Sequence, residues 1–140
     1  MNTMAHTDFS QEEREQIYKD FKQAVNITSS DLEEWLKTEE SKGVYFKEDE
    51  TGELVGHESG RKIIEILHKK KADLVNTDYA HMRKVVGYVH RHTAQRPSGN
   101  IDVTPWRYSL KNWGHEPKKS KVHKREESRA YNLLKPASIS

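Results

Sequence analysis

Apolar residues recur at helical spacing in five stretches of this 140-residue chain, with polar segments between them. In the first stretch the apolar side chains share one face: Ile17, Tyr18, Phe21, Ala24 and Val25. Ser10 and Glu13 precede that face with the spacing of a capping box, in which each side chain accepts a hydrogen bond from the other residue's backbone amide. The pattern predicts a first helix over residues 10–25.

The second and third helices are predicted on either side of an acidic connection over residues 39–59. The second has adjacent candidate N-caps at residues 28–30, and its apolar stripe is Leu32, Trp35 and Leu36. The third begins with Ser59 as its N-cap and ends in lysines 69–71, and its apolar positions are Ile63, Ile64, Ile66 and Leu67. Apolar residues at both ends of the connection indicate a short hairpin within residues 43–56.

The fourth helix, over residues 78–93 with a cap at Thr77-Asp78, has the clearest amphipathic pattern in the chain. Its predicted buried stripe is Tyr79, Met82, Val85, Val86 and Val89, and its opposite face carries Arg83, Lys84, Gly87 and Arg91. Glycine inside a helix costs about 1 kcal/mol relative to alanine. Gly87 therefore indicates the close approach of a second backbone, either that of a neighbouring helix or that of a nucleic-acid strand.

The fifth helix is bounded by two clear signals. Thr104 is a good N-cap and is followed by Pro105, whose missing N–H is harmless at the first helical position. Trp106, Leu110 and Trp113 form the stripe, and Gly114 is placed to end the helix. The chain is therefore predicted to be an all-α bundle of about five helices, with the third and fourth as a helix-turn-helix-like pair.

The bundle is predicted to be one domain over residues 10–117. It follows a disordered lead-in at residues 1–9 and precedes a flexible basic tail at residues 118–140, because neither end has a buried face. The chain lacks cysteine, which excludes disulfides and thiolate sites. It also has no apolar run long enough for a membrane span. We expect a cytoplasmic or nuclear protein without membrane contact.

Charge is segregated along the chain, although the net charge is only +2. Residues 1–59 carry a net charge of -9, residues 60–115 carry +7, and residues 116–140 carry +4. Such asymmetry fits an anionic partner for the basic part. It also fits an acidic half that docks on the basic half within one fold, and the sequence leaves both interpretations open.

Candidate chemistry is limited to hydrogen bonding and charge. His57, Glu58 and Ser59 are adjacent, and neighbouring residues seldom face one another as an acid–base pair or nucleophile requires. His81, His90, His92 and His115 lack the spacing of a helical metal site, so a site would need His57 or His115 folded back. We predict no enzymatic activity, no cofactor and no metal. Residues 56–60 are interpreted as a helix entry whose amides hold an anion or an internal carboxylate, with His57 and Glu58 as structural hydrogen-bonding residues.

Several blocks of the sequence resemble a known family. They are Val25–Thr28, Leu36–Ser41, Gly56–Leu67, Lys69–Asp73, Asp78–His92, Ala94–Pro97, Trp106–Leu110 and Asn112–His115. Together they resemble domain-of-unknown-function family 3140, an uncharacterised bacterial and fungal family, over about residues 10–117. Because members are often labelled as DNA-binding, the resemblance implies DNA binding. It also implies partners similar to small tudor-like β-barrel proteins, and it assigns no catalytic residue.

These patterns predict a non-catalytic nucleic-acid-binding protein, with DNA preferred to RNA, that contacts phosphates through a basic helix face and tail. Tyr88 and His92 are expected to stack or hydrogen-bond at the same surface. The alternative is an adaptor whose basic face docks an acidic protein. The candidate anion-contacting residues are Ser59, Gly60, Arg61, Lys62, Arg83, Lys84, Gly87, Arg91, Arg96, Lys118, Lys119, Lys121, Lys124 and Arg125.

Overall fold

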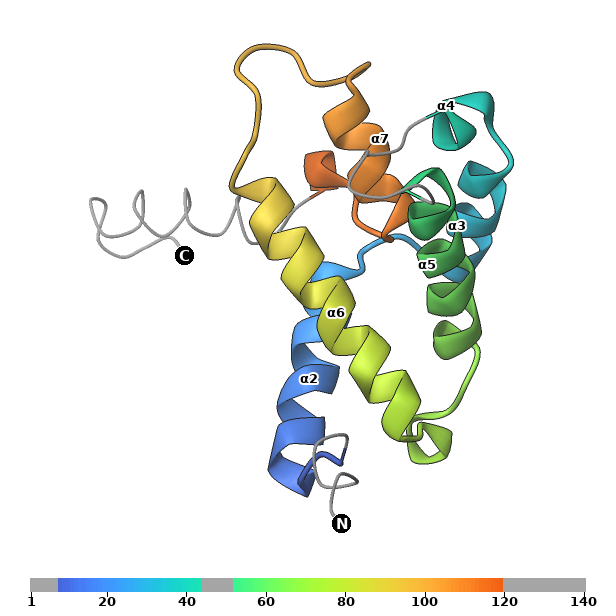
Figure 1. Ribbon diagram of the computed structural model, residues 1–140, viewed down its shortest axis with the longest axis vertical. Helices are drawn as coiled ribbons and strands as arrows, with labels where there is room; N and C mark the ends of the chain where they lie inside the picture. Colours follow the sequence, from blue (N-terminus) through green and yellow to red (C-terminus); the bar gives the residue numbers. More distant parts are fainter. Residues whose placement is uncertain (1–7, 44–51, 120–140) are drawn as a thin grey trace, which may run out of the picture.

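The computed structural model describes residues 8–43 and 52–119, and these ranges contain helices and no strand. The α-helices are α2 (Gln11–Ala24), α3 (Ser29–Leu36), α4 (Glu39–Lys42), α5 (Gly52–Leu67), α6 (Asn76–Thr93) and α7 (Pro105–Asn112). Two 3₁₀ turns, η1 (Lys71–Asp73) and η2 (Pro117–Lys119), complete the described elements. The predicted all-α fold is confirmed (Figure 1).

Three predicted helix starts are confirmed by their caps. Ser10 Oγ accepts from the Glu13 amide at 3.1 Å, and the Glu13 carboxylate accepts from the Ser10 amide at 2.8 Å, which completes the capping box. Thr28 caps α3 by accepting from the Asp31 amide. Thr104 accepts from the Arg107 amide at the start of α7, with Pro105 in the first turn as expected.

The predicted start of the third helix is wrong. Helix α5 begins at Gly52, so Ser59 lies inside it and is not an N-cap. Glycines 56 and 60 suggested a break, but both lie inside the helix, and close packing requires a glycine at position 60. A Cβ at Gly60 would lie 2.8 Å from the Asn112 carbonyl oxygen and 2.9 Å from Leu36 Cδ1. The predicted anion-holding helix entry at residues 56–60 is therefore wrong as well.

Smaller corrections concern the connections. Helix α6 begins two residues early with Val75 as N-cap, and Asp78 accepts from the Val75 amide at 2.9 Å. The connection after α3 includes the short helix α4, which Thr38 caps. Most of the predicted hairpin lies at residues 44–51, outside the described ranges, but its second half is wrong because residues 52–56 are helical. Phe9, assigned to the disordered lead-in, instead donates its amide proton to Asn76 Oδ1 at 3.3 Å.

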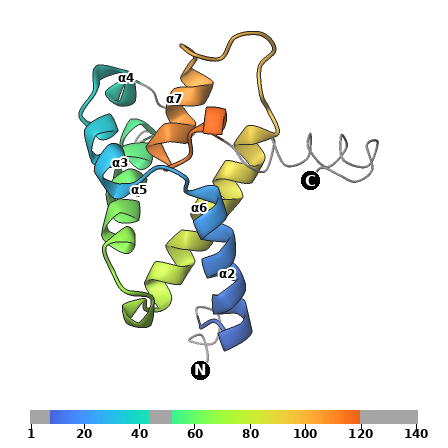
Figure 2. The same ribbon diagram turned by 180° about the vertical axis from the view of Figure 1, so that it is seen from behind.

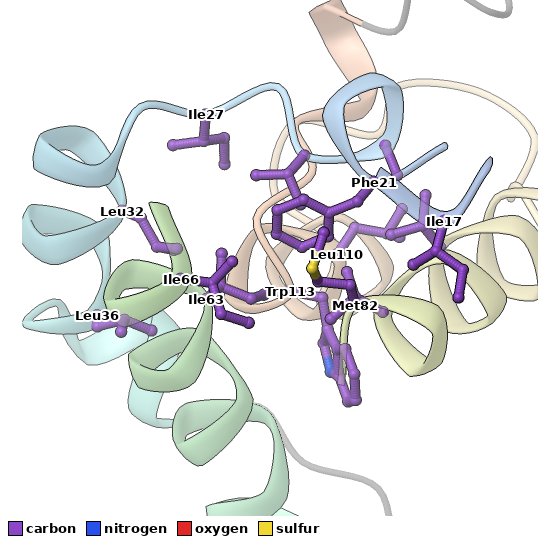
Figure 3. Packing of buried hydrophobic residues seen from close by; sticks show 14 of the residues in the cluster. Ile17, Phe21, Ile27, Leu32, Leu36, Ile63, Ile66, Met82, Leu110 and Trp113 are labelled. Carbon is purple, nitrogen blue, oxygen red and sulfur yellow. The ribbon is translucent and has the colours of Figure 1, made fainter. Parts of the chain in front are cut away.

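One continuous core joins the helices, and α7 is at its centre. Helix α2 packs along α6, α3 packs along α5, and α7 contacts α3, α4, α5 and α6 (Figures 1 and 2). In Figure 3 the α3–α5 side of the core is formed by Leu32, Leu36, Ile63 and Ile66. The α2–α6 side is formed by Ile17, Phe21 and Met82, and the α7 side chains that pack with both are Leu110 and Trp113. The predicted buried stripe of α6 is confirmed, with Met82 and Val85 fully buried.

Gly114 ends α7 as predicted and turns the chain back onto α2. Its φ is +81°, and the amides of Gly114 and His115 donate to the carbonyls of Lys111 and Leu110, both at 2.9 Å. This is the Schellman arrangement. The Gly114 carbonyl then accepts from the amides of Asn26 and Ile27 at 3.1 and 3.3 Å. The end of α7 thereby fixes the connection between α2 and α3.

Replacing Gly114 by alanine is expected to lower the free energy of unfolding by roughly 2 kcal/mol, measured by urea denaturation. A side chain in this backbone region costs about 1–2 kcal/mol, and a Cβ would lie 3.1 Å from Val25 Cγ1. Gly99→Ala is the matched control, because Gly99 has φ +83° and no atom within 4 Å of its Cβ position. Equal losses in the two variants would contradict a packing role for Gly114.

Candidate functional site

Asn112, at the end of α7, is the centre of a buried polar network. Its Oδ1 accepts from the Trp35 indole N–H at 2.7 Å and from the Ser41 hydroxyl at 2.6 Å. Its Nδ2 donates to the Ser41 carbonyl oxygen at 3.3 Å. Ser41 Oγ also lies 2.8 Å from His57 Nε2. The network therefore joins α3, α4, α5 and α7, and the sequence patterns gave no indication of this role for Ser41 or Asn112.

The Ser41–His57 pair does not have the arrangement of an activated nucleophile. An amide oxygen only accepts hydrogen bonds, so the Ser41 hydroxyl proton is directed at Asn112. His57 Nε2 must then donate to Ser41 and cannot remove its proton. Ser41 is also 0% exposed, so a substrate cannot reach its hydroxyl. His57 is a structural hydrogen-bonding residue, as the sequence suggested.

A second serine–histidine pair joins α5 to α6. Ser59 Oγ lies 3.1 Å from His81 Nε2, and Ser59 is only 3% exposed. Burial, reinforced by the charges of Lys62 and Lys84, lowers the pKa of His81 to about 4. His81 is therefore neutral near pH 7 and is a weak base. Ser59 is a packing residue between helices and lies away from the surface.

Five rings form a continuous stack along the contact between α6 and α7. Their order is His81, Trp113, Tyr88, His92 and Trp106. The closest pair is Tyr88 and Trp113, with centroids 4.2 Å apart and planes 9° apart. The Trp106 indole N–H also donates to the His92 carbonyl at 2.7 Å. Tyr88 and His92, expected to contact a ligand at the surface, instead stack on these protein rings.

The histidines considered as metal ligands make separate contacts. His57 and His81 bind serines, and His92 belongs to the ring stack. His115 is buried, and its Nδ1 lies 2.6 Å from the Ala24 carbonyl oxygen. Within residues 8–43 and 52–119, no three His, Asp or Glu side chains come together as a metal ion would require.

Arg107 of α7 is neutralised within the fold. Arg107 Nε and Nη2 donate to the two Glu116 carboxylate oxygens at 2.9 and 2.7 Å. Burial alone would raise the pKa of Glu116, but the Arg107 hydrogen bonds and the Lys118 amide lower it overall. Lys111 Nζ lies 3.9 Å from the same carboxylate and 3.9 Å from the Trp35 ring centroid, and both cations are partly buried.

The cations of the predicted basic face are exposed and have no ion-pair partner. In the described part of the chain, no carboxylate lies within 4.0 Å of six of them: Arg61, Lys62, Arg83, Lys84, Arg91 and Arg96. Two of them contact aromatic rings instead: Arg83 lies 5.4 Å from the Phe9 centroid, and Arg96 lies 5.5 Å from that of Trp106. Lys62 on α5 and Lys84 on α6 are close enough together that both act on His81.

Gly87 lies in the middle of the basic α6 face, midway between Arg83 and Arg91 in sequence. A Cβ there would meet only Arg91 Nη1, at 3.1 Å, and no backbone atom within 4 Å. The neighbouring-helix explanation of this glycine is therefore wrong for the described residues. Gly60 is the position where a neighbouring helix approaches closely. At Gly87 the neighbour that a side chain would meet is the Arg91 guanidinium.

The remaining candidate residues fall into three groups. Ser59 and Gly60 are buried, so they face other helices. Lys118 and Lys119 are exposed in η2, and Lys118 is paired with Asp102. Lys121, Lys124 and Arg125 lie outside the described residues. The structure thus places the predicted cations on the neighbouring helices α5 and α6. It excludes Ser59 and Gly60 as anion-contacting residues, because both are buried.

Charge segregation is not explained by ion pairs within the fold. Among the ion pairs of the described residues, only Lys71–Glu15, at 2.9 Å, joins residues 8–43 to the basic part. The contact between α2 and α6 is made by apolar side chains such as Ile17, Phe21 and Met82. Residues 8–43 are therefore joined to the basic part mainly by apolar packing.

The fold and this surface define a small all-α protein with an uncompensated basic helix face. It belongs to the DUF3140 family, described as "protein of unknown function", whose model matches residues 20–111, more than half of the chain. The resemblance seen in the sequence blocks is thereby confirmed. No curated protein and no solved structure matches the chain. Within the described ranges, the helices all lack the length and apolar character needed to cross a bilayer.

Proposed function

We propose that this protein binds nucleic acid, DNA in preference to RNA, without catalysing a reaction. The observation that carries the proposal is the set of exposed cations on α5 and α6 that have no described carboxylate partner. Unpaired cations on one surface provide sequence-independent affinity for phosphates, because binding releases condensed counterions. Carboxylates are also missing from the exposed α6 positions between Ala80 and Ala94.

The arrangement of α5 and α6 supports the same proposal. Lys62 and Lys84 come from different helices and both lower the pKa of His81, against the opposing charge of Glu58, so cations of the two helices lie near the same histidine. The helices act as a helix-turn-helix-like pair in which α6 presents Arg83, Lys84 and Arg91. The connection between them, residues 68–75, is longer than the strict motif allows. The pair therefore serves to expose a basic helix, with the basic tail adding further phosphate contacts.

The test is fluorescence anisotropy with a random 20-base-pair duplex across a salt series. We expect a dissociation constant below about 1 μM at low salt that rises steeply with salt. Arg83→Ala combined with Arg91→Ala should weaken binding and lower the magnitude of the salt slope by about 2. Lys19→Ala combined with Lys42→Ala is the matched control, because these exposed residues of α2 and α4 remove the same charge elsewhere.

Loss of affinity in the control equal to that in the α6 variant would show that net charge alone is responsible. No binding of wild-type protein at low salt would overturn the proposal. An acidic protein partner for the same basic face would then be the better explanation, since its carboxylates would fit the same unpaired cations.

A further inference from the structure

None of the described Phe, Tyr and Trp side chains is exposed, since each is buried or partly buried. Trp113, Trp106, Tyr88 and His92 stack on one another, and Trp35 contacts Tyr108 and Lys111. The remaining rings are buried or are covered by a cation on one face: Phe9, Tyr18, Phe21 and Tyr79. The large hydrophobic side chains exposed in these ranges are Val75 and Val103, and neither is aromatic.

This arrangement disfavours single-stranded nucleic acid. Proteins that hold single strands without sequence preference stack successive bases on exposed aromatic side chains, each worth about 1–3 kcal/mol. No described Phe, Tyr or Trp is exposed for such a contact, and the exposed rings are the imidazoles of His68 and His90. The exposed α6 positions between Ala80 and Ala94 are cationic or small, apart from His90. Charge is therefore the main feature of this surface, and charge is densest on a double helix, which carries one phosphate per about 1.7 Å of its axis.

The positions of the cations along α6 indicate how the helix meets its ligand. A recognition helix of the helix-turn-helix type contacts base edges with its N-terminal residues. The first turn of α6 instead contains Asp78, whose carboxylate binds Lys69 at 2.6 Å. The unpaired cations begin at Arg83, in the middle of the helix, and continue to Arg91 near its end. The N-terminal turn is thus the least cationic part of α6.

Arg83, Gly87 and Arg91 lie on one ridge of the helix, four residues apart. Arg83 and Arg91 are separated by about 12 Å along the helix axis, which is the rise of about three to four nucleotides in one strand of a duplex. At Gly87, midway between them, no backbone atom comes within 4 Å of the Cβ position, and the Arg91 guanidinium lies beside it, 3.1 Å from where a Cβ would be. A phosphate strand following this ridge would meet Arg83 at one end and the Arg91 guanidinium beside Gly87.

We infer that the ligand is double-stranded nucleic acid, and that the middle and C-terminal half of α6 lie along the sugar–phosphate backbone of the duplex. The inference rests on the proposed function and specifies both the ligand class and the contact. Gly87 is then the position of closest approach, with the Arg91 guanidinium beside it.

The first experiment compares a 20-base-pair duplex with one of its strands alone, at equal phosphate concentration and equal salt. We expect the duplex to bind at least about tenfold more tightly. Equal or tighter binding of the single strand would overturn this inference and leave nucleic-acid binding intact. Failure of both ligands to bind would overturn the inference together with the proposed function.

The second experiment adds the same bulk at two places on α6. Gly87→Gln should weaken duplex binding by about tenfold, whereas Thr77→Gln, in the exposed first turn, should change it by less than about twofold. Glutamine is a good helix former, and circular dichroism should show both variants folded. Loss of binding in Thr77→Gln, or no effect of Gly87→Gln, would overturn the backbone-following arrangement.

Discussion

Replacing Asn112 by alanine is expected to lower the free energy of unfolding by roughly 3–4 kcal/mol, the largest single effect that the network predicts. The substitution removes the acceptor for the Trp35 indole and the Ser41 hydroxyl, and the donor for the Ser41 carbonyl. Each buried group left without its partner costs about 1–3 kcal/mol. Because four helices meet at this amide, the loss should appear in one cooperative transition. Urea denaturation followed by circular dichroism measures it.

Ser109→Ala is the matched control for this prediction. Ser109 lies on the same helix and is equally buried, at 2% exposure, but its hydroxyl has no hydrogen-bond partner among the described residues. Removing that hydroxyl should change stability by less than about 0.5 kcal/mol or raise it slightly. A loss below about 1 kcal/mol in Asn112→Ala would contradict the structural role assigned to the network.

Local signals predicted most of the helices. The capping box at Ser10 and Glu13, the Thr104-Pro105 start and the Gly114 end each determine a backbone conformation within one turn of chain. The apolar stripe of α6 likewise follows from spacing alone, because one face of that helix packs and the other does not. Such features need no knowledge of the partner helices, and the structure confirms them.

Two interpretations of glycines, the helix entry at Gly60 and the neighbouring helix at Gly87, were wrong because they depend on tertiary contacts. Gly60 resembled part of a helix entry, but it lies inside α5 where the Asn112 carbonyl and Leu36 leave no room for a side chain. Gly87 suggested a neighbouring helix, and none approaches it in the described residues. A sequence shows that a glycine is tolerated at a position. Which element comes close to it is decided by residues far away in the chain.

The basic face was predicted in part for a similar reason. Spacing placed Arg83, Lys84 and Arg91 on the outward side of α6, since that side is opposite the apolar stripe. Spacing could not show that Arg107 is neutralised by Glu116, whereas Lys62 and Arg61 have no such partner. Ion pairs between distant residues decide which cations remain available, and they appear only once the helices are assembled.

Acid is expected to destabilise the protein below about pH 6.5, the ordinary pKa of histidine. Burial, with Lys62 and Lys84, lowers the pKa of His81 to about 4, and burial also lowers that of His115. The unfolded chain therefore binds protons before the folded protein does. The stability that these neutral histidines contribute is complete above about pH 6.5 and is lost as the pH falls toward about 4.

The contribution of the histidines to this pH dependence of stability can be separated from that of the carboxylates. Each unit of pKa difference corresponds to about 1.4 kcal/mol, so His81, which is partly exposed, should contribute roughly 2 kcal/mol. Glu116, whose pKa is lowered, loses its contribution only below its unfolded value near 4.5. Unfolding free energies measured between pH 7 and about 4.5 therefore report mainly the histidines.

His81→Gln should flatten that part of the profile, because glutamine can replace the hydrogen bond to Ser59 without taking up a proton. An unchanged slope in His81→Gln would mean that the imidazole between α5 and α6 is already solvated in the folded protein.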